Sequence, residues 1–361
     1  MWTPPSGPIG TGVWVPVGAA LLIMFSSCTS ALPHGSRTTT RHAPRPSVEI
    51  TGFRWSQVQT KSAPPPRVMA QMAYDTASAQ LILVGGERQV ETQSTPIIKA
   101  TALDDTWVLL GTTWIRLHPI TSPPKEPLTA AYDPANRQLI LIAAPLRTRA
   151  GRVLPSTTWT WRGRTWSRLA GMTPNPGTNG EDMAYDSATR QLVFVGGGTW
   201  VLRDSKWRRV SVLQPMITAI AFDPLSDRLV GGSSQSERMW WWDGRQWREY
   251  AEPPSLELNP VYNPEPSANW VTDTAVNEIF VEGDCGFTPS GKQAYACTWS
   301  GDVWVPILTA STPAIDNPEN FSLAYDPPLH AVVAFGGDQG VRTPAGDWIV
   351  GGSQTWFLTH G

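Results

Sequence analysis

Several polar side chains in this sequence could contact a ligand through amide or carboxyl groups. We expect five of them to do so: Gln71, Glu87, Asp182, Asn269 and Asp338. Groups of this kind donate or accept hydrogen bonds and fix the orientation of polar ligands. A solvated polar rim without a ligand is the simpler alternative. Acid–base hydrolysis by the adjacent carboxyls of Glu181 and Asp182 is the enzymatic one.

The elements that would hold these side chains form an internal repeat. A sequence motif with an aspartate between two apolar runs occurs six times, at intervals of roughly fifty residues. The aspartates are Asp75, Asp133, Asp186, Asp223, Asp273 and Asp326. Each copy predicts two strands around a short polar turn, and an aspartate leading such a turn is typical of Asx turns. We therefore interpret all six aspartates as structural. The candidates Gln71, Asp182 and Asn269 each stand four residues before one of them.

A second motif, rich in tryptophan, follows the first in five of the six copies. It holds many of the 19 tryptophans of the 361-residue chain. Four copies have two tryptophans seven residues apart, as in Trp107 and Trp114, and the fifth has Cys297 in the first place. A two-residue turn at positions such as Leu110-Gly111 would put the two tryptophans directly opposite each other on one face of a hairpin. This pattern predicts a tryptophan core in each sheet.

The chain begins and ends inside one repeat. The last copy stops at its third strand, and residues 51–55 have the pattern of the missing fourth strand, with Trp55 in the second tryptophan position. Joining the two ends would close a ring and cover the free strand edges. We therefore predict an all-β fold: a six-bladed β-propeller of four-stranded antiparallel blades, closed by an N-terminal strand that joins the last blade.

Glycine pairs at the end of the second strand, followed by two aromatic residues separated by six others, resemble the kelch repeat of galactose-oxidase-like β-propellers. The pairs are at 85–86, 196–197, 231–232 and 336–337, with Ala143-Ala144 and Glu282-Gly283 in the other copies. The resemblance covers about residues 51–361 and implies the fold, but not a function, because this fold carries enzymes and scaffolds alike.

The resemblance to galactose oxidase raises the question of a copper site. That site needs two histidines, two tyrosines and a cysteine. Of the five histidines here, two lie near the N-terminus, and we expect His118 on the face opposite His330 and His360, which we place in short turns. These side chains could not converge on one ion, so we expect no copper chemistry, no metal and no other cofactor.

The N-terminal region has the pattern of an export signal. The first 28 residues hold no Asp, Glu, Lys or Arg, and an apolar run over residues 13–25 precedes Cys28. This arrangement resembles the lipobox of bacterial lipoproteins, which implies a signal peptide over residues 1–28 and lipidation of Cys28. A plain secretory signal is the alternative. Residues 29–50, rich in Ser, Thr, Pro and Arg, read as a disordered tether before the propeller at 51–361.

The other two cysteines, Cys285 and Cys297, flank a loop between two strand-like runs. With Cys28 lipidated they form an even pair, and an oxidising compartment would favour a disulfide between them. Two free thiols are the alternative.

Composition and loop lengths limit the function. A formal net charge of −2 argues against a nucleic-acid partner. The long connections would all lie on one face, where binding usually occurs. They span residues 87–105, 145–157, 284–296 and 338–354. We expect a monomeric module outside the cytoplasm, held at the membrane only by its lipid anchor or else secreted. It would recognise a carbohydrate or protein partner on this long-loop face. Trp270 and Trp348, outside the hairpin register, could form a platform for a sugar. The alternatives are a propeller enzyme acting on sugars (isomerase, lyase or hydrolase) and a structural envelope protein.

Overall fold

The computed structural model describes residues 52–92, 95–125, 127–145, 153–175, 181–211, 215–233, 236–250, 270–282, 285, 292–299, 301, 303–309, 321–336, 341–343 and 348–360. The described strands all belong to one compact unit, Pro46–Gly361. The predicted signal peptide, Cys28 and tether lie outside the described residues. Within the described part, no helix is long and apolar enough to cross a membrane.

The described strands form seven four-stranded antiparallel sheets, and six of these sheets each contain one copy of the repeat. The first three are β2 (Gln71–Asp75), β3 (Gln80–Val84), β6 (Thr106–Leu110) and β7 (Thr113–Leu117); β8 (Pro127–Asp133), β9 (Gln138–Ala143), β10 (Thr157–Trp161) and β11 (Trp166–Arg168); and β12 (Asp182–Asp186), β13 (Gln191–Val195), β14 (Thr199–Arg203) and β15 (Lys206–Ser211). The next three are β16 (Ala219–Asp223), β17 (Arg228–Ser233), β18 (Ser236–Trp242) and β19 (Trp247–Glu249); β20 (Trp270–Asp273), β21 (Glu278–Glu282), β22 (Ala296–Trp299) and β23 (Trp304–Ile307); and β24 (Phe321–Asp326), β25 (Ala331–Gly336) and β28 (Thr355–His360) with β1 (Phe53–Val58).

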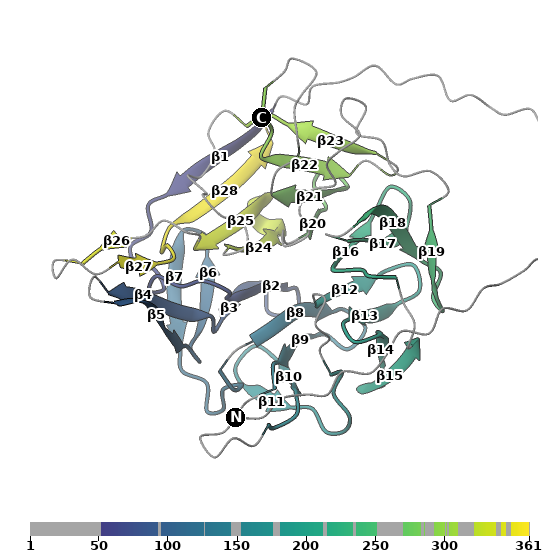
Figure 1. The fold of residues 1–361 in the computed structure, drawn as a ribbon, viewed down its shortest axis with the longest axis horizontal. Coiled ribbons are helices and arrows are strands. Elements are labelled where there is room, and N and C mark those ends of the chain that lie inside the picture. Colours follow the sequence, from purple (N-terminus) through teal and green to yellow (C-terminus); the bar gives the residue numbers. More distant parts are fainter. Residues whose placement is uncertain are drawn as a thin grey trace, which may run out of the picture. The chain divides into compact units, whose positions relative to one another are not determined.

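The first strands of these six sheets stand side by side in a closed ring. Each first strand contacts the next one around the ring, in the order β2, β8, β12, β16, β20 and β24, and β24 contacts β2 again. Figure 1 shows the sheets extending outward from this ring. This is the arrangement of a β-propeller. The predicted closure is confirmed, because β1 pairs antiparallel with β28, with Phe53 opposite His360.

The seventh sheet corrects the prediction of six sheets joined by long loops. The connections expected at 87–105 and 338–354 contain β4 (Glu87–Thr92), β5 (Thr95–Ala102), β26 (Val341–Arg342) and β27 (Trp348–Val350), in the order β26-β27-β4-β5. Strand β27 pairs with β4, Val350 opposite Gln89. Both connections leave neighbouring sheets at the same end, and pairing satisfies backbone donors and acceptors that would otherwise need other partners.

The six repeat aspartates cap the turns that follow them, five of them as the predicted Asx turns. Asp75 Oδ1 accepts a hydrogen bond from the backbone N–H of Ala77 at 3.0 Å. Four others accept the equivalent bond, from Ala135, Ala188, Leu225 and Ala275. Asp326 accepts one from Leu329, three residues on, because Pro327 and Pro328 have no N–H, and it caps a short 3-10 helix. The residue four positions after each aspartate has a left-handed backbone with φ between 47° and 58°, which lets the next strand begin at once. The structural interpretation of these aspartates is therefore confirmed.

The tryptophan hairpins have the predicted core role but a different register. The second tryptophan lies opposite the residue two places after the first: Trp114 pairs with Leu109, and Trp166 with Trp161. The predicted pairing of Trp107 with Trp114 was wrong. The reason is that Gly111, with φ of 60°, occupies the first position of the two-residue turn instead of the second.

The second tryptophan of four hairpins also reaches into the neighbouring sheet. Trp166 Nε1 donates a hydrogen bond to Thr106 Oγ1 at 3.0 Å, and both side chains are fully buried. The same bond recurs three times: Trp114 to Thr355, Trp207 to Thr158, and Trp247 to Thr199. Each threonine stands directly before the first tryptophan of its own copy. These bonds connect consecutive sheets around the ring.

The glycine pairs do not all occupy equivalent positions, which corrects the predicted alignment. Gly231 and Gly232 lie inside β17, whereas Gly85 and Gly86 follow β3. Each still allows a close approach: a Cβ on Gly86 would lie 2.6 Å from the carbonyl oxygen of Val68, and one on Gly232 would lie 2.6 Å from the Trp270 ring. Glu282 is the last residue of β21, inside the strand and not in the turn after it.

The predicted disulfide between Cys285 and Cys297 is present, with the two Cα atoms 5.9 Å apart. Cys297 takes the place of the first tryptophan in the fifth copy. Both cysteines are buried in a cluster with Trp299 and Trp304. The bridge thus occupies core space that a tryptophan fills elsewhere.

We predict that Thr106→Val destabilises the protein by about 1–3 kcal/mol, because it leaves the buried Trp166 N–H without an acceptor. Thr106→Ser, which keeps the hydroxyl, is the matched control and should lose clearly less. Urea unfolding followed by tryptophan fluorescence measures both. Equal stability of the valine variant and the wild type would show that the indole bond contributes nothing.

We also predict that the double variant Cys285→Ser/Cys297→Ser is less stable by about 2–4 kcal/mol, because the bridge restricts the unfolded chain. Thermal unfolding of this variant, and of the wild type with and without reductant, measures the effect. Reductant should lower the stability of the wild type only. A variant as stable as the oxidised wild type contradicts the prediction.

Candidate functional site

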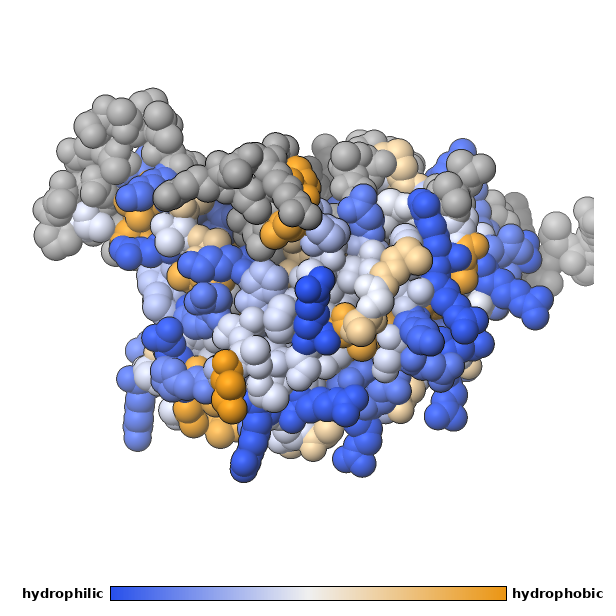
Figure 2. All heavy atoms as spheres, turned by 90° about the horizontal axis from the view of Figure 1, so that it is seen from below, coloured by the Kyte–Doolittle hydropathy of each residue, from blue (hydrophilic) through white to orange (hydrophobic). Residues whose placement is uncertain are grey.

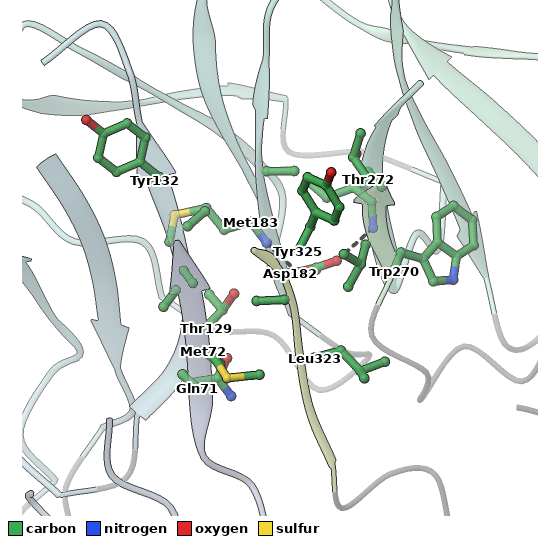
Figure 3. Close-up of a pocket in the computed structure, with 18 of the residues that line it drawn as sticks. Gln71, Met72, Thr129, Tyr132, Asp182, Met183, Trp270, Thr272, Leu323 and Tyr325 are labelled. Carbon is green, nitrogen blue, oxygen red and sulfur yellow. Dashed lines mark hydrogen bonds between the residues drawn. The ribbon is translucent and has the colours of Figure 1, made fainter. Parts of the chain in front are cut away.

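A cavity of about 220 Å³ lies within the ring, and all six first strands (β2, β8, β12, β16, β20 and β24) contribute to its wall. Figure 3 shows this cavity and its lining side chains. This volume is below the range of roughly 300–1,000 Å³ for drug-sized ligands. It therefore suits a small group or the end of a larger ligand.

One end of the cavity is polar. Its side chains come from the starts of different strands and include Gln71, Thr129, Asp182 and Ser322. The strand starts lie beside the ends of the second strands, as in the pairing of Asp182 with Val195, so this end is where the long connections begin. Toward the other ends of these strands the wall carries Tyr132, Thr272 and Tyr325 (Figure 3). The repeat offset thus located the polar end from the sequence.

Asp182 is the ionisable carboxyl of this wall. Its Oδ1 accepts a hydrogen bond from the backbone N–H of Met183 at 2.7 Å. Its Oδ2 accepts one from the backbone N–H of Ile220, in the neighbouring strand β16, at 2.8 Å. These two bonds favour the ionised form, but desolvation outweighs them and raises the pKa of Asp182 to about 7.

Two hydroxyls of the wall are engaged by the fold. Ser322 Oγ donates to the backbone carbonyl of Ala70 at 2.7 Å, and Thr272 Oγ1 donates to that of Phe222 at 2.6 Å. Like Asp182, they connect neighbouring first strands.

The amide of Gln71 and the hydroxyl of Thr129 differ from these groups. Within the described part of the chain, neither side chain makes a hydrogen bond, although both line the cavity. These two groups are free to bind a ligand.

The structure does not bring all five predicted contacts together. Glu87 lies in β4, where its backbone pairs with Val68 and its carboxylate accepts a hydrogen bond from the Gln89 amide, outside the cavity wall. Asn269 and Asp338 lie outside the described residues. Gln71 and Asp182 are therefore the two predicted contacts that the structure places at the cavity.

The proposed aromatic platform is not formed by Trp270. Its side chain is buried and packs edge-on against Trp304, with ring centroids 5.1 Å apart. Figure 3 shows its indole directed away from the cavity. The prediction was wrong because the ring enters the space that Gly232 leaves open. Trp348 has its backbone in β27, and its side chain lies outside the described residues.

Glu282 was not predicted as a notable residue. Its side chain is buried at the end of β21, and burial raises its pKa to about 8. Among the described residues, none bonds its Oε2. The departure from the glycine pattern at Glu282 was the only signal in the sequence. This carboxyl does not line the cavity.

The histidines give no metal site within the described part of the chain, where no three His, Cys, Asp or Glu side chains are placed to hold an ion. His360 was predicted in a short turn but is the last residue of β28, because its strand extends to pair with Phe53. Its Nε2 lies 2.7 Å from Oδ2 of Asp273, in the fifth sheet. This pair connects two sheets away from the cavity.

The surface seen in Figure 2 mixes hydrophilic and hydrophobic side chains, with the exposed apolar ones scattered among charged ones. The most exposed large apolar side chains of the described residues, such as Ile120 and Met172, come from connections between strands. The cavity, and not an apolar surface, is therefore the candidate site.

No protein-family model matches the chain, and no curated protein matches it. Several solved structures have a similar fold. A proposed gluconolactonase is 13% identical with a TM-score of 0.47, covering 88% of this chain and 97% of the other. Streptogramin B lyase is 8% identical with a TM-score of 0.46, covering 86% and 98%. YjhT is 11% identical with a TM-score of 0.45, covering 81% and 95%.

We predict that Asp182→Asn makes stability less dependent on pH. In the unfolded chain Asp182 ionises near its ordinary value of 3.8, but in the folded chain it keeps its proton up to about 7. The folded state therefore binds more protons between these values, so the wild type loses stability as pH rises from about 4 to about 7 and then levels off. Asparagine removes this loss. Urea unfolding at several pH values measures it, and parallel curves for the two proteins would contradict the prediction.

Proposed function

We propose that this chain is an extracytoplasmic binding protein, a monomer anchored by lipid at Cys28. It would recognise a carbohydrate or a protein partner at the long-loop face and the mouth of the central cavity. The observation that carries the proposal is the polar end of the cavity, where the Gln71 amide and the Thr129 hydroxyl make no hydrogen bond to the described part of the chain. Secretion without lipidation is the alternative form.

The fold we propose is a kelch-like six-bladed propeller. In this interpretation the six sheets that contribute a strand to the ring are the blades. The seventh sheet, formed by β26, β27, β4 and β5, is an accessory sheet built from the connections of the first and last blades. The glycine pairs and paired aromatic positions support the kelch likeness, with the departures described above.

The compartment is supported by the disulfide between Cys285 and Cys297, because such bridges persist mainly in oxidising environments. The apolar N-terminal run before Cys28 supports export and anchoring. A net charge near zero supports a partner other than nucleic acid.

The chemistry of the cavity favours a carbohydrate over a protein surface. An amide, a hydroxyl and a carboxyl at one end of a small cavity match the hydroxyl groups of a sugar, each of which donates and accepts. The cavity volume of about 220 Å³ admits a small group and not a folded surface. A protein partner would have to bind the long connections instead.

A second candidate function is acid–base catalysis on a sugar by an isomerase, lyase or hydrolase. The observation in its favour is the pKa of Asp182, about 7, since a catalytic acid or base works best with a pKa near the operating pH. The partial exposure of Asp182 to the cavity would let it exchange a proton with a bound ligand.

The test is a glycan array probed with the full chain and with the double variant Gln71→Ala/Thr129→Val. We expect the wild type to bind a glycan and the variant to lose at least about tenfold in affinity, since it removes two hydrogen-bonding groups. Lys206→Gln, at an exposed position beside the short turn between β14 and β15, is the control and should bind normally. Melting temperatures check that all three proteins are folded.

The other outcomes separate the alternatives. Glycan binding that survives in the double variant contradicts a role for the cavity. Absence of any glycan, together with one protein captured by crosslinking on intact cells, favours a protein partner at the connections. If a bound glycan is converted to product and Asp182→Asn stops conversion but not binding, the enzymatic candidate is correct. Absence of every partner leaves a structural envelope role.

A further inference from the structure

The cavity wall carries one charged side chain. Among the described residues that line it, Asp182 is the sole carboxyl, and none is Lys, Arg or His. The other side chains are neutral: an amide, hydroxyls, aromatic rings and small or apolar groups. Among the described residues, a ligand in this cavity therefore meets one group that can become negatively charged, the Asp182 carboxyl, and no cationic side chain.

We propose that the cavity binds a small ligand carrying an ammonium group, held against the Asp182 carboxylate, with ligand hydroxyls toward Gln71 and Thr129. This inference rests on the proposed function to the extent that the cavity is the binding site. The inference adds that the ligand is positively charged, which the hydrogen-bonding groups of the cavity do not determine by themselves.

The first argument is the missing counter-ion. A carboxylate can accept about four hydrogen bonds, and Asp182 receives two, from the backbone N–H groups of Met183 and Ile220. A partly buried carboxylate without a cation is costly to ionise, which agrees with the direction of its pKa shift. An ammonium group would supply the charge that the wall lacks, whereas a neutral sugar would leave the carboxylate unpaired.

The second argument is the rest of the wall. Tyr132, Tyr185, Phe222 and Tyr325 line the same cavity toward the other ends of their strands. All four are neutral residues and add no cation to the wall. An anionic ligand would meet the Asp182 charge with nothing to compensate it. Both observations select a cation over an anion.

The groups near Asp182 that titrate are few. Glu181 precedes it, packs against Gly196, and has a pKa raised by burial. Tyr185 and Tyr325 are also lining residues, and burial raises the pKa of both phenols above its ordinary value. The paired strand β13 has no titratable side chain, and neither do the lining residues of β16 and β20. Among the described lining residues, Asp182 is therefore the carboxyl that can give the wall its negative charge.

The experiment compares choline with its uncharged isostere, the alcohol in which a tert-butyl group replaces the trimethylammonium group. Titration calorimetry with the full chain is carried out roughly one and a half pH units below and one unit above the pKa of Asp182. The charge of choline does not change with pH, so any pH dependence comes from the protein. We expect choline to bind at least about tenfold more tightly at the higher pH, because each unit by which it lowers the Asp182 pKa corresponds to a factor of ten. The alcohol should bind more weakly, with no pH dependence.

Asp182→Asn should reduce choline affinity at the higher pH by at least about tenfold and remove the pH dependence. Glu249→Gln, which removes an exposed carboxyl of β19, is the control for net charge and should bind choline normally. The pH comparison on the wild type keeps the test valid even if the asparagine variant unfolds.

Other results overturn the inference. Equal binding of both compounds without pH dependence would show a cavity that binds small ligands without using charge, which contradicts the ammonium proposal but keeps the proposed function. Binding of neither compound, or choline binding unchanged in Asp182→Asn, also rejects the ammonium proposal. In those cases the glycan array with the Gln71→Ala/Thr129→Val variant still decides the proposed function by itself.

Discussion

The fold depends on a hydrogen bond between neighbouring sheets, from a buried indole N–H to a buried threonine hydroxyl. A tryptophan at a sheet interface supplies a large apolar area and also a donor that, when buried, most often has an acceptor. Thr106, Thr158, Thr199 and Thr355 provide that acceptor for the next sheet. In the fourth and fifth copies Met239 and Ala296 stand in the threonine position, and other bonds connect those sheets. Trp299 Nε1 donates to Asp223 at 3.2 Å, and His360 pairs with Asp273. The ring is thus held by one repeated interaction with local substitutes around the fifth sheet.

This ring determines what the cavity can do. Its wall is formed by the first strands, which are joined to one another by side chain–backbone bonds such as Asp182 to Ile220 and Ser322 to Ala70. Side chains fixed in this way need little reordering when a ligand binds, which lowers the entropic cost of binding. The same bonds show that a polar residue at the cavity can serve the fold and the ligand together.

Much of the fold could be predicted because its signals are local. The aspartate turns, the paired apolar runs and the closure by residues 51–55 each depend on residues close together in the sequence. The predictions of strand pairing were wrong in two situations. Either two turn positions were equally compatible with the sequence, or the paired strands lay far apart in the sequence. Gly111 could occupy either position of its turn, so the hairpin register was misassigned. The seventh sheet joins β4 to β27, segments separated by most of the chain, and neither has a pattern that names the other as its partner.

The site shows the same division. The offset of four residues before each repeat aspartate identified the cavity wall, but not which of its side chains are engaged by neighbouring strands. Equivalent positions hold Gln71, Thr129, Ala219 and Ser322 in other copies, so a neutral residue satisfies the fold there. The N–H of Ile220 could be accepted by the oxygen of an asparagine as well as by a carboxylate. The fold therefore has no need of a negative charge at position 182, and the desolvation that raises the pKa of Asp182 shows that the charge is unfavourable without a partner. The cationic ligand proposed above would supply the compensating charge that the described residues of the wall do not.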